Sequence, residues 1–166
     1  EDEWLYKSSI VKNRLKSILG ENKYRVGGRE TSISEISSKQ KNDFLERYHI
    51  QGKDSSVAKI GAFKDNTLIS VMTFSKPRIS LGQKSREDGV WELSRFASIS
   101  DTYTPGVASK LFSYFLDKYF PKMIYSYSDV RWNTGILYKN LGMRYSGTTF
   151  STFSCISSKL SLYASI

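Results

Sequence analysis

One histidine, one aspartate and one glycine turn are the features of the sequence that could support chemistry. His49 is the only histidine, so any general base that requires an imidazole must be this residue. It also lies where a predicted helix ends, and capping that helix would explain it equally well. Asp129 closes a short apolar segment, Lys122–Asp129, at a position where α/β proteins bind ligands. Its alternative role is the N-cap of the following helix.

The glycine turn lies between a predicted strand and a predicted helix. Val90–Ile99 alternates and is rich in β-branched and aromatic residues, which predicts a strand. After Pro105 and Gly106, apolar residues recur at helical spacing as far as Phe120. Free backbone N–H groups and the helix dipole converge at such a turn, so it suits an anion. Many strand–turn–helix units share this glycine, and the turn alone does not identify a ligand.

The residues around this turn resemble the GNAT acetyltransferase superfamily. That family has a turn of the form Q/R-x-x-G-x-G/A, which Gly106 and Ala108 match, whereas Tyr103 occupies the Gln/Arg position. A second family motif, L-Y-x-x-x-G-F, matches Leu137–Met143 with methionine in the last position. The resemblance implies an α/β (α+β) fold with a mixed, mostly antiparallel sheet flanked by helices. It also implies an acyl-CoA (acetyl-CoA) site formed by Phe96, Gly106, Val107 and Ala108.

The same region resembles the Mom branch of the superfamily, the phage DNA-adenine modification proteins. The segments YSYSD and TGILYKNLG carry this resemblance. It implies roles for Ser126 and Asp129, with Ser128 in place of a family alanine. Tyr138 occupies the position where many GNAT enzymes place a general acid, and a buried core aromatic would explain it as well. The predicted catalytic residues are therefore His49, Ser126, Asp129 and Tyr138.

The first 28 residues are expected to form an N-terminal helical appendage. Residues 1–20 predict a helix that ends at Gly20 and leaves Trp4 or Ile10 poorly covered, and residues 21–30 are typical of a linker. The pattern E-D-E-W…L-G is similar to the end of a Vsr-like (EDxHD) nuclease domain of phage homing endonucleases. FLERYHIQG resembles the domain that follows it there. This resemblance implies a boundary between an appendage, residues 1–28, and a GNAT-like domain, residues 29–166. It also implies an upstream nuclease domain as partner, and a protein located in the cytoplasm of an infected bacterium.

The net charge of +9 favours a polyanionic partner, and we predict double-stranded DNA. General solubility is the alternative explanation. Lysine and arginine neutralise phosphates, and an exposed tryptophan can stack on a base. The predicted nucleic-acid-binding residues are Lys76, Arg78, Lys84, Arg86, Arg95, Arg131 and Trp132.

Composition argues against several other classes of protein. No apolar run is long enough to predict a membrane span, so we expect no membrane partner. A single cysteine, Cys155, rules out an internal disulfide and fits a reducing compartment. One histidine and one distant cysteine do not make the usual zinc ligand set, and we predict no metal site.

Two functions are compatible with these observations. The main hypothesis is a DNA-binding, target-recognition domain of a homing-type endonuclease, and the alternative is an acyl-CoA-dependent acyltransferase that modifies a nucleobase or another amine. Both need the same scaffold. Strands Val90–Ile99 and Lys122–Ser128 should be parallel neighbours, joined through a right-handed crossover by the helix Pro105–Phe120. A capped helix at Ser37–Tyr48 and a hairpin at Val57–Phe74 should precede them.

Overall fold

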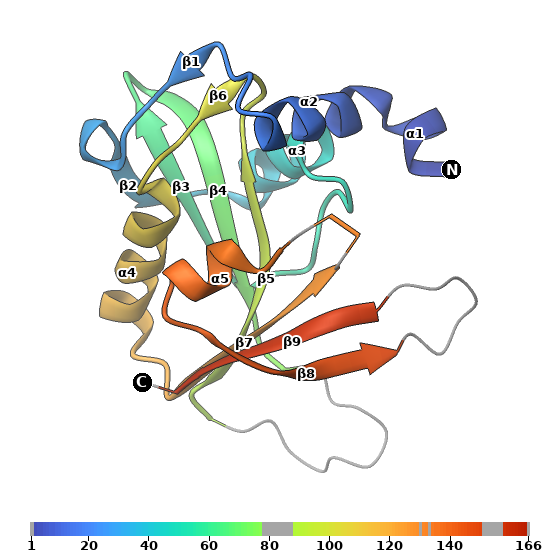
Figure 1. Cartoon of the computed structure of the whole chain (residues 1–166). Helices are drawn as coiled ribbons and strands as arrows, with labels where there is room; N and C mark the ends of the chain where they lie inside the picture. The colour runs from blue at the N-terminus through green and yellow to red at the C-terminus, as the bar shows by residue number, and fades with distance from the viewer. Residues whose placement is uncertain (1, 78–87, 130, 133, 151–157, 166) are drawn as a thin grey trace.

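Seven strands form one mixed sheet in the part of the chain that the structure describes. The computed structural model describes residues 2–77, 88–129, 131, 132, 134–150 and 158–165. The strand order is β2-β3-β4-β5-β7-β9-β8, and all neighbours are antiparallel except β5 and β7 (Figure 1). The predicted fold, a mostly antiparallel sheet flanked by helices, is confirmed. The strands are β2 (Ser32–Glu35), β3 (Ala58–Lys64), β4 (Thr67–Ser75), β5 (Val90–Ser98), β7 (Met123–Asp129), β8 (Arg144–Phe150) and β9 (Ser158–Ser165).

Two helices cover opposite faces of the sheet. Helix α3 (Ser38–Tyr48) buries Phe44 and Leu45 in one apolar cluster, together with Val71 of β4. Helix α4 (Val107–Tyr119) packs on the other face, where Phe115 stacks on Phe74 of β4 with ring centroids 3.5 Å apart. Because side chains alternate along a strand, β4 supplies both clusters and forms the middle of the core.

In the part of the chain that precedes β5, the helix and the hairpin predicted from local sequence signals are both present. The side chain of Ser37 accepts a hydrogen bond from the backbone of Gln40, and Gln40 returns one to Ser37, which completes the capping box of α3. The β3–β4 hairpin turns at Asp65 and Asn66, both of which have positive φ. The predicted crossover is also present, because α4 joins the parallel strands β5 and β7.

Strands β5 and β7 are paired only at their first residues and then diverge; we call this divergence the fork. Their parallel ladder runs from Val90–Met123 to Glu92–Tyr125 and ends there. Just beyond it, the hydroxyl of Ser126 donates to the carbonyl of Leu93 at 2.8 Å. Beyond this point β7 continues in its ladder with β9, while β5 remains paired with β4. The two strands therefore separate without losing their outer partners.

The N-terminal segment differs from the single helix and linker that we predicted. It forms two helices, α1 (Asp2–Tyr6) and α2 (Ser8–Ile18), divided at Lys7. Trp4 is 51% exposed, as expected, whereas Val11 is buried and Ile10 half-buried. The predicted linker is docked: β1 (Tyr24–Arg25) pairs in parallel with β6 (Thr102–Tyr103), and a short 3-10 helix, η1 (Gly28–Glu30), contacts α4. Main-chain pairing with the β5–α4 connection thus replaces the free linker.

The last part of the chain follows the predicted order with shifted boundaries. Helix α5 (Ile136–Asn140) is shorter than the predicted segment 133–143, and β9 extends past the predicted end at residue 156. Figure 1 shows α2 beside the end of β5, α1 farther out toward the N-terminus, and α5 near the fork. Among the described helices, none is long and apolar enough to cross a membrane.

Candidate active site

A bulge in β5 gives the fork two chemically different sides. Thr73 of β4 pairs with Arg95 and Phe74 pairs with Leu93, so Ser94 is an extra residue. Trp91 and Leu93 face α4 in the apolar core. By alternation Glu92 faces α3, and because of the bulge Arg95 shares that face with Thr73. We call these the α4 side and the α3 side of the fork.

The glycine turn lies on the α4 side. Gly106 is the N-cap of α4 with φ 75°, a left-handed conformation that favours glycine, and it has no side-chain cap. The first turn of a helix has no acceptor of its own for its N–H groups, and such a turn suits an anion. At the start of α4, the N–H of Val107 donates to the carbonyl of Thr104 at 3.3 Å. Of the other predicted cofactor contacts, Val107 is fully buried, and Phe96 and Ala108 are partly buried against the same core.

The docked N-terminal segment supports this turn closely. The backbone N–H of Gly28 donates to the carbonyl of Pro105 at 2.8 Å. A Cβ atom at position 28 would lie 2.9 Å from both the carbonyl carbon and the oxygen of Gly106. Lys110 also donates to the carbonyls of Gly28 and Thr31. Only glycine permits this approach, which the sequence motif did not reveal.

Tyr138 and two serines complete the α4 side. The Tyr138 ring is 8% exposed and belongs to the core cluster, as its structural explanation predicted. Ser126 and Ser128 are both buried, and Ser126 is occupied by its bond to Leu93. The Ser128 hydroxyl has no hydrogen-bond partner in the described part of the chain. A buried hydroxyl without a partner is costly, so its place beside the fork suits a polar group of a ligand.

His49 lies on the α3 side as a neutral imidazole. It is the C-cap of α3, and its Nδ1 accepts a hydrogen bond from the backbone of Gln51 at 3.1 Å. Burial, and then the charges of Arg95 and Arg14, lower the pKa of His49 to about 3. With Nδ1 an acceptor, the proton of the neutral ring is on Nε2. His49 therefore presents a hydrogen-bond donor at Nε2 in this geometry, and its role as a general base stays a prediction.

A buried ion pair fixes the loop that follows His49. Lys41 of α3 and Asp54 are 2.8 Å apart, with side chains 3% and 8% exposed. Burial alone would raise the pKa of Asp54, but hydrogen bonds from Lys41, Thr73 and Ser56 together lower it. The Asp54 carboxylate thus joins α3, this loop and β4. No sequence motif identifies the pair, because its members are linked only by the fold.

Arg14 of α2 reaches the open end of the fork, a contact that sequence reasoning missed. Its Nη2 donates to the carbonyl of Trp132 at 2.7 Å, and the neighbouring Asn13 accepts from the backbone of Asp101, just past β5. Helix α2 therefore joins the ends of both diverging strands. Burial lowers the pKa of Arg14, and the opposing influence is Tyr138, so the Arg14 guanidinium lies near that residue. In the sequence, the signal for this contact was Arg14 itself, a cation beside the apolar face of the predicted N-terminal helix.

The predicted nucleic-acid residues do not gather in one place among the described residues. Lys76 lies 3.7 Å over the Trp91 ring, and Arg95 lies in the α3 side. Arg131 pairs with Asp129 at 2.7 Å and with Glu3 at 3.5 Å. The indole N–H of Trp132 donates to Glu3. Three further members, Arg78, Lys84 and Arg86, lie outside the described residues.

Asp129 does not cap the following helix, because the N-cap of α5 is Gly135. The carboxylate of Asp129 instead accepts from the backbone and side chain of Arg131. Among the described residues, no three His, Cys, Asp or Glu side chains lie close enough together to hold a metal ion.

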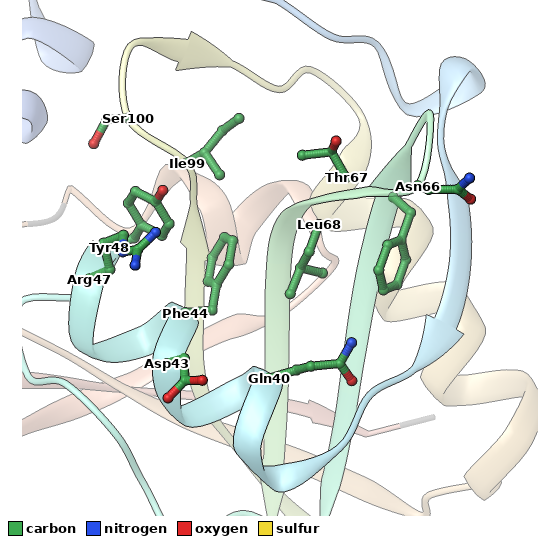
Figure 2. Close-up of a pocket in the computed structure, with 11 residues that line it drawn as sticks. Gln40, Asp43, Phe44, Arg47, Tyr48, Asn66, Thr67, Leu68, Ile99 and Ser100 are labelled. Carbon is green, nitrogen blue, oxygen red and sulfur yellow. The ribbon is translucent and has the colours of Figure 1, made fainter.

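A separate groove lies away from the fork (Figure 2). It runs between α3, the β3–β4 hairpin and the end of β5, with Phe44, Leu68 and Ile99 among its lining residues. Asp43 and Arg47 of α3 stand at its edge. None of the predicted catalytic or cofactor-binding residues lines it. The groove and the fork are therefore distinct features of the α3 face.

Comparison with known proteins identifies the fold. No protein-family model and no curated protein matches the sequence. The structure is similar to ribosomal-protein-S18-alanine N-acetyltransferase from Escherichia coli, with TM-score 0.62, 10% identity, and coverage of 82% of this chain and 94% of that one. It is also similar to a Bacillus subtilis acetyltransferase in complex with CoA, with TM-score 0.60, 14% identity, and coverage of 82% and 99%. A GNAT-family acetyltransferase from Streptococcus pneumoniae matches with TM-score 0.61, 12% identity, and coverage of 82% and 99%. The chain therefore has the fold of the GNAT acetyltransferases.

Proposed function

We propose that the protein is an acyl-CoA-dependent N-acyltransferase, the alternative hypothesis of the sequence analysis. The observation that carries the proposal is the fork between β5 and β7, with the glycine turn of α4 at one side and a polar, charged surface at the other. The similar structures include an acetyltransferase with CoA bound, which supports the same conclusion. Fold alone does not give function, so the argument rests on these residues.

The residues of the α4 side fit an acyl-CoA. The pyrophosphate would be held by N–H groups at Gly106–Ala108, where the left-handed glycine leaves room for it. The unpartnered hydroxyl of Ser128 would bind a polar group of the pantetheine arm. When bound, acyl-CoA supplies an activated acyl thioester. Tyr138, whose ring is fixed in the core, holds a hydroxyl proton for the leaving thiolate.

The residues of the α3 side would receive the acceptor amine. Glu92 lies at the last paired position of the fork, half-buried, with its side chain on this side. Its carboxylate is placed to take the proton that the amine loses on attack. His49 donates from Nε2 and would orient the acceptor rather than remove its proton. In this proposal Glu92 replaces His49 as the base, a residue that the sequence motifs did not single out.

Thermal melting with acetyl-CoA tests the proposal. A ligand at about 100 times its Kd should stabilise the protein by about 2.7 kcal/mol, which a melt resolves. Gly106→Glu should abolish this stabilisation, because a side chain and a negative charge enter the anion site. Gly20→Glu is the matched control, since Gly20 is also an exposed glycine with positive φ, but it follows α2 and lies far from α4 in sequence. A wild-type protein that acetyl-CoA does not stabilise would refute the proposal.

DNA recognition remains the second candidate, supported by the net charge of +9. Affinity for a duplex should fall with salt by about one log–log unit for each phosphate contact. Lys84→Ala combined with Arg86→Ala should reduce that slope by about two if both residues touch phosphate. Titrations that detect no duplex binding at low salt would reject this function.

A further inference from the structure

Two half-buried cations of the N-terminal segment, Lys7 and Arg14, lie at the α3 side without a carboxylate partner among the described residues. The Arg14 guanidinium is bonded to a carbonyl oxygen of Trp132, and its Nε is buried without a partner in the described part of the chain. Lys7 likewise donates to the carbonyl of Ile50 at 2.7 Å. Within the described residues, neither cation has a carboxylate at ion-pair distance. Removing part of a charged group from water without a counter-ion costs free energy, and a ligand that carries a negative charge would offset this cost.

The charges converge on one point, the His49 ring. Arg95, Arg14 and Lys7 all act on it as positive charges, and they come from β5, α2 and the residue between α1 and α2. Asp54 opposes them, and this carboxylate already has its own buried counter-ion in Lys41. Since His49 is neutral, it does not add to the charge and offers only a donor. The surroundings of this ring are therefore positive.

We propose that Arg14, with Arg95 and Lys7 around His49, selects acceptor amines that also carry a carboxylate or phosphate group. The inference rests on the proposed acyltransferase function and names its acceptor class. Glu92 lies where the fork begins and Arg14 lies at its open end, so the amine meets the carboxylate and the anionic group meets the cations. A bipolar acceptor matches both ends of the site, whereas a plain amine brings no counter-charge to Arg14.

The position of Arg14 makes the N-terminal segment a part of the acceptor site. Asn13 and Arg14 tie α2 to the ends of both strands, through Asp101 and Trp132. Trp132 is in turn bonded to Glu3 of α1. The segment is thus held by specific contacts, and it adds Arg14 and Lys7 to the one cation, Arg95, that the sheet supplies. Arg14 acts here as a specificity-determining residue.

Melting curves with matched acceptor pairs test this without any need for turnover. The probes are O-phosphoethanolamine against ethanolamine, and lysine against lysinamide, which differ in the anionic group alone. We expect each anionic probe to raise the melting temperature and each neutral probe to leave it unchanged. Arg14→Gln should weaken anionic binding by about tenfold to a hundredfold, the range for a hydrogen bond to a charged group. Arg14→Lys, which keeps the charge, should restore part of it.

Lys12→Gln is the matched control, because Lys12 is an exposed cation two residues away on the same helix. It should bind both anionic probes as the unaltered protein does. Comparison of O-phosphoethanolamine with lysine shows whether the site prefers a phosphate or a carboxylate group. Equal stabilisation by anionic and neutral probes, or a response to inorganic phosphate that Arg14→Gln does not change, would overturn the inference. So would Arg14-dependent binding of duplex DNA alone.

The acetyl-CoA melt separates this failure from failure of the proposed function. If acetyl-CoA stabilises the protein through Gly106 but no anionic amine binds, the acyltransferase proposal stands and the acceptor class is wrong. In turnover assays of thiol release, Arg14→Gln should raise KM for the anionic acceptor by about tenfold or more, with a smaller change in kcat for that acceptor. A general loss of kcat with every acceptor would indicate a structural role for Arg14 and overturn the inference.

Discussion

The two sides of the fork are stabilised by different physics. On the α4 side, Phe74, Trp91 and Phe115 form a stacked and edge-on aromatic core, and the site elements are attached to it. On the α3 side, Lys41 and Asp54 form a buried ion pair beside a desolvated histidine. Apolar burial is insensitive to pH and charge, whereas buried ionic groups depend on every partner. The α4 side should therefore withstand changes that disable the α3 side.

Of the substitutions considered, removal of Lys41 should destabilise the α3 side most. Lys41→Met leaves the Asp54 carboxylate buried without its cation, and we expect a loss of about 3 kcal/mol in the free energy of unfolding by urea. Lys39→Met, an exposed lysine on the same helix, should change it little. If Lys41→Met also removed the acetyl-CoA stabilisation in protein that remains folded, the two sides would not be independent.

Gly28→Ala should disturb the α4 side through the turn. The new Cβ would overlap the Gly106 carbonyl, and we expect a loss of about 2 kcal/mol together with weaker acetyl-CoA binding. Gly27→Ala is the control, because its Cβ would meet only the movable carboxylate of Glu30 at 3.2 Å. Similar losses in both variants would show that the close approach to Gly106 has no special role.

The α3 side should also respond to mild acid. Because the pKa of His49 is lowered from 6.5 to about 3, the unfolded chain binds a proton below pH 6.5 that the folded protein does not. The contribution of the neutral His49 to the free energy of unfolding is complete above pH 6.5 and is lost as the pH falls toward 3. Between about pH 7 and about pH 5, the free energy of unfolding should fall by about 1 to 2 kcal/mol. Urea titrations at both values measure it.

His49→Gln is the control for this pH effect, since it removes the titrating group. The carboxyl groups with lowered pKa values, Asp54, Glu30 and Glu35, lose their contribution only at more acidic pH, below their ordinary values of 3.8 and 4.5. The interval above pH 5 thus isolates the histidine. An unchanged slope in His49→Gln would assign the acid sensitivity to another group.

The smallest effects should come from two serines on the same face of β7. Ser126→Ala removes a buried hydrogen bond to Leu93 and should cost about 1 kcal/mol. Ser128→Ala removes a buried hydroxyl without a described partner, and should stabilise the free protein by up to about 1 kcal/mol while weakening acetyl-CoA binding. Chemical denaturation with and without ligand separates the two effects. Destabilisation by Ser128→Ala would show that this hydroxyl is already satisfied.

The sequence predicted local features better than contacts between distant segments, because their determinants differ in range. The capping box at Ser37 and Gln40, the turn at Asp65–Asn66 and the glycine at 106 act within a few residues, and each formed as expected. Arg14 and Trp132 are brought together across 118 positions. No local pattern encodes such a contact. The docking of Gly28 failed as a prediction for the same reason, since a glycine pair is typical of a linker until its neighbour is known.

His49 shows a different limit. Its type and its position at the end of α3 were predicted, yet its protonation depends on charges from β5 and α2 and on one backbone bond from Gln51. A residue's identity fixes what chemistry is available, whereas its environment decides which form is present. The upstream nuclease domain, the boundary at residue 28 and the contact with DNA, all inferred from the sequence, remain predictions.

The bulge at Ser94 makes this one position of β5 tolerant of both substitution and deletion. Any small residue could occupy position 94 and preserve the alternation on either side of it. Because the β4 partners of Leu93 and Arg95 are adjacent residues, deletion of Ser94 would leave a regular ladder in which every later side chain keeps its present face. Insertion of one residue into a regular stretch of the strand would instead reverse every later side chain, and the two sides of the fork would exchange their residues. The extra residue thus stands outside the alternation that defines the two sides, and the strand can lose it without losing either.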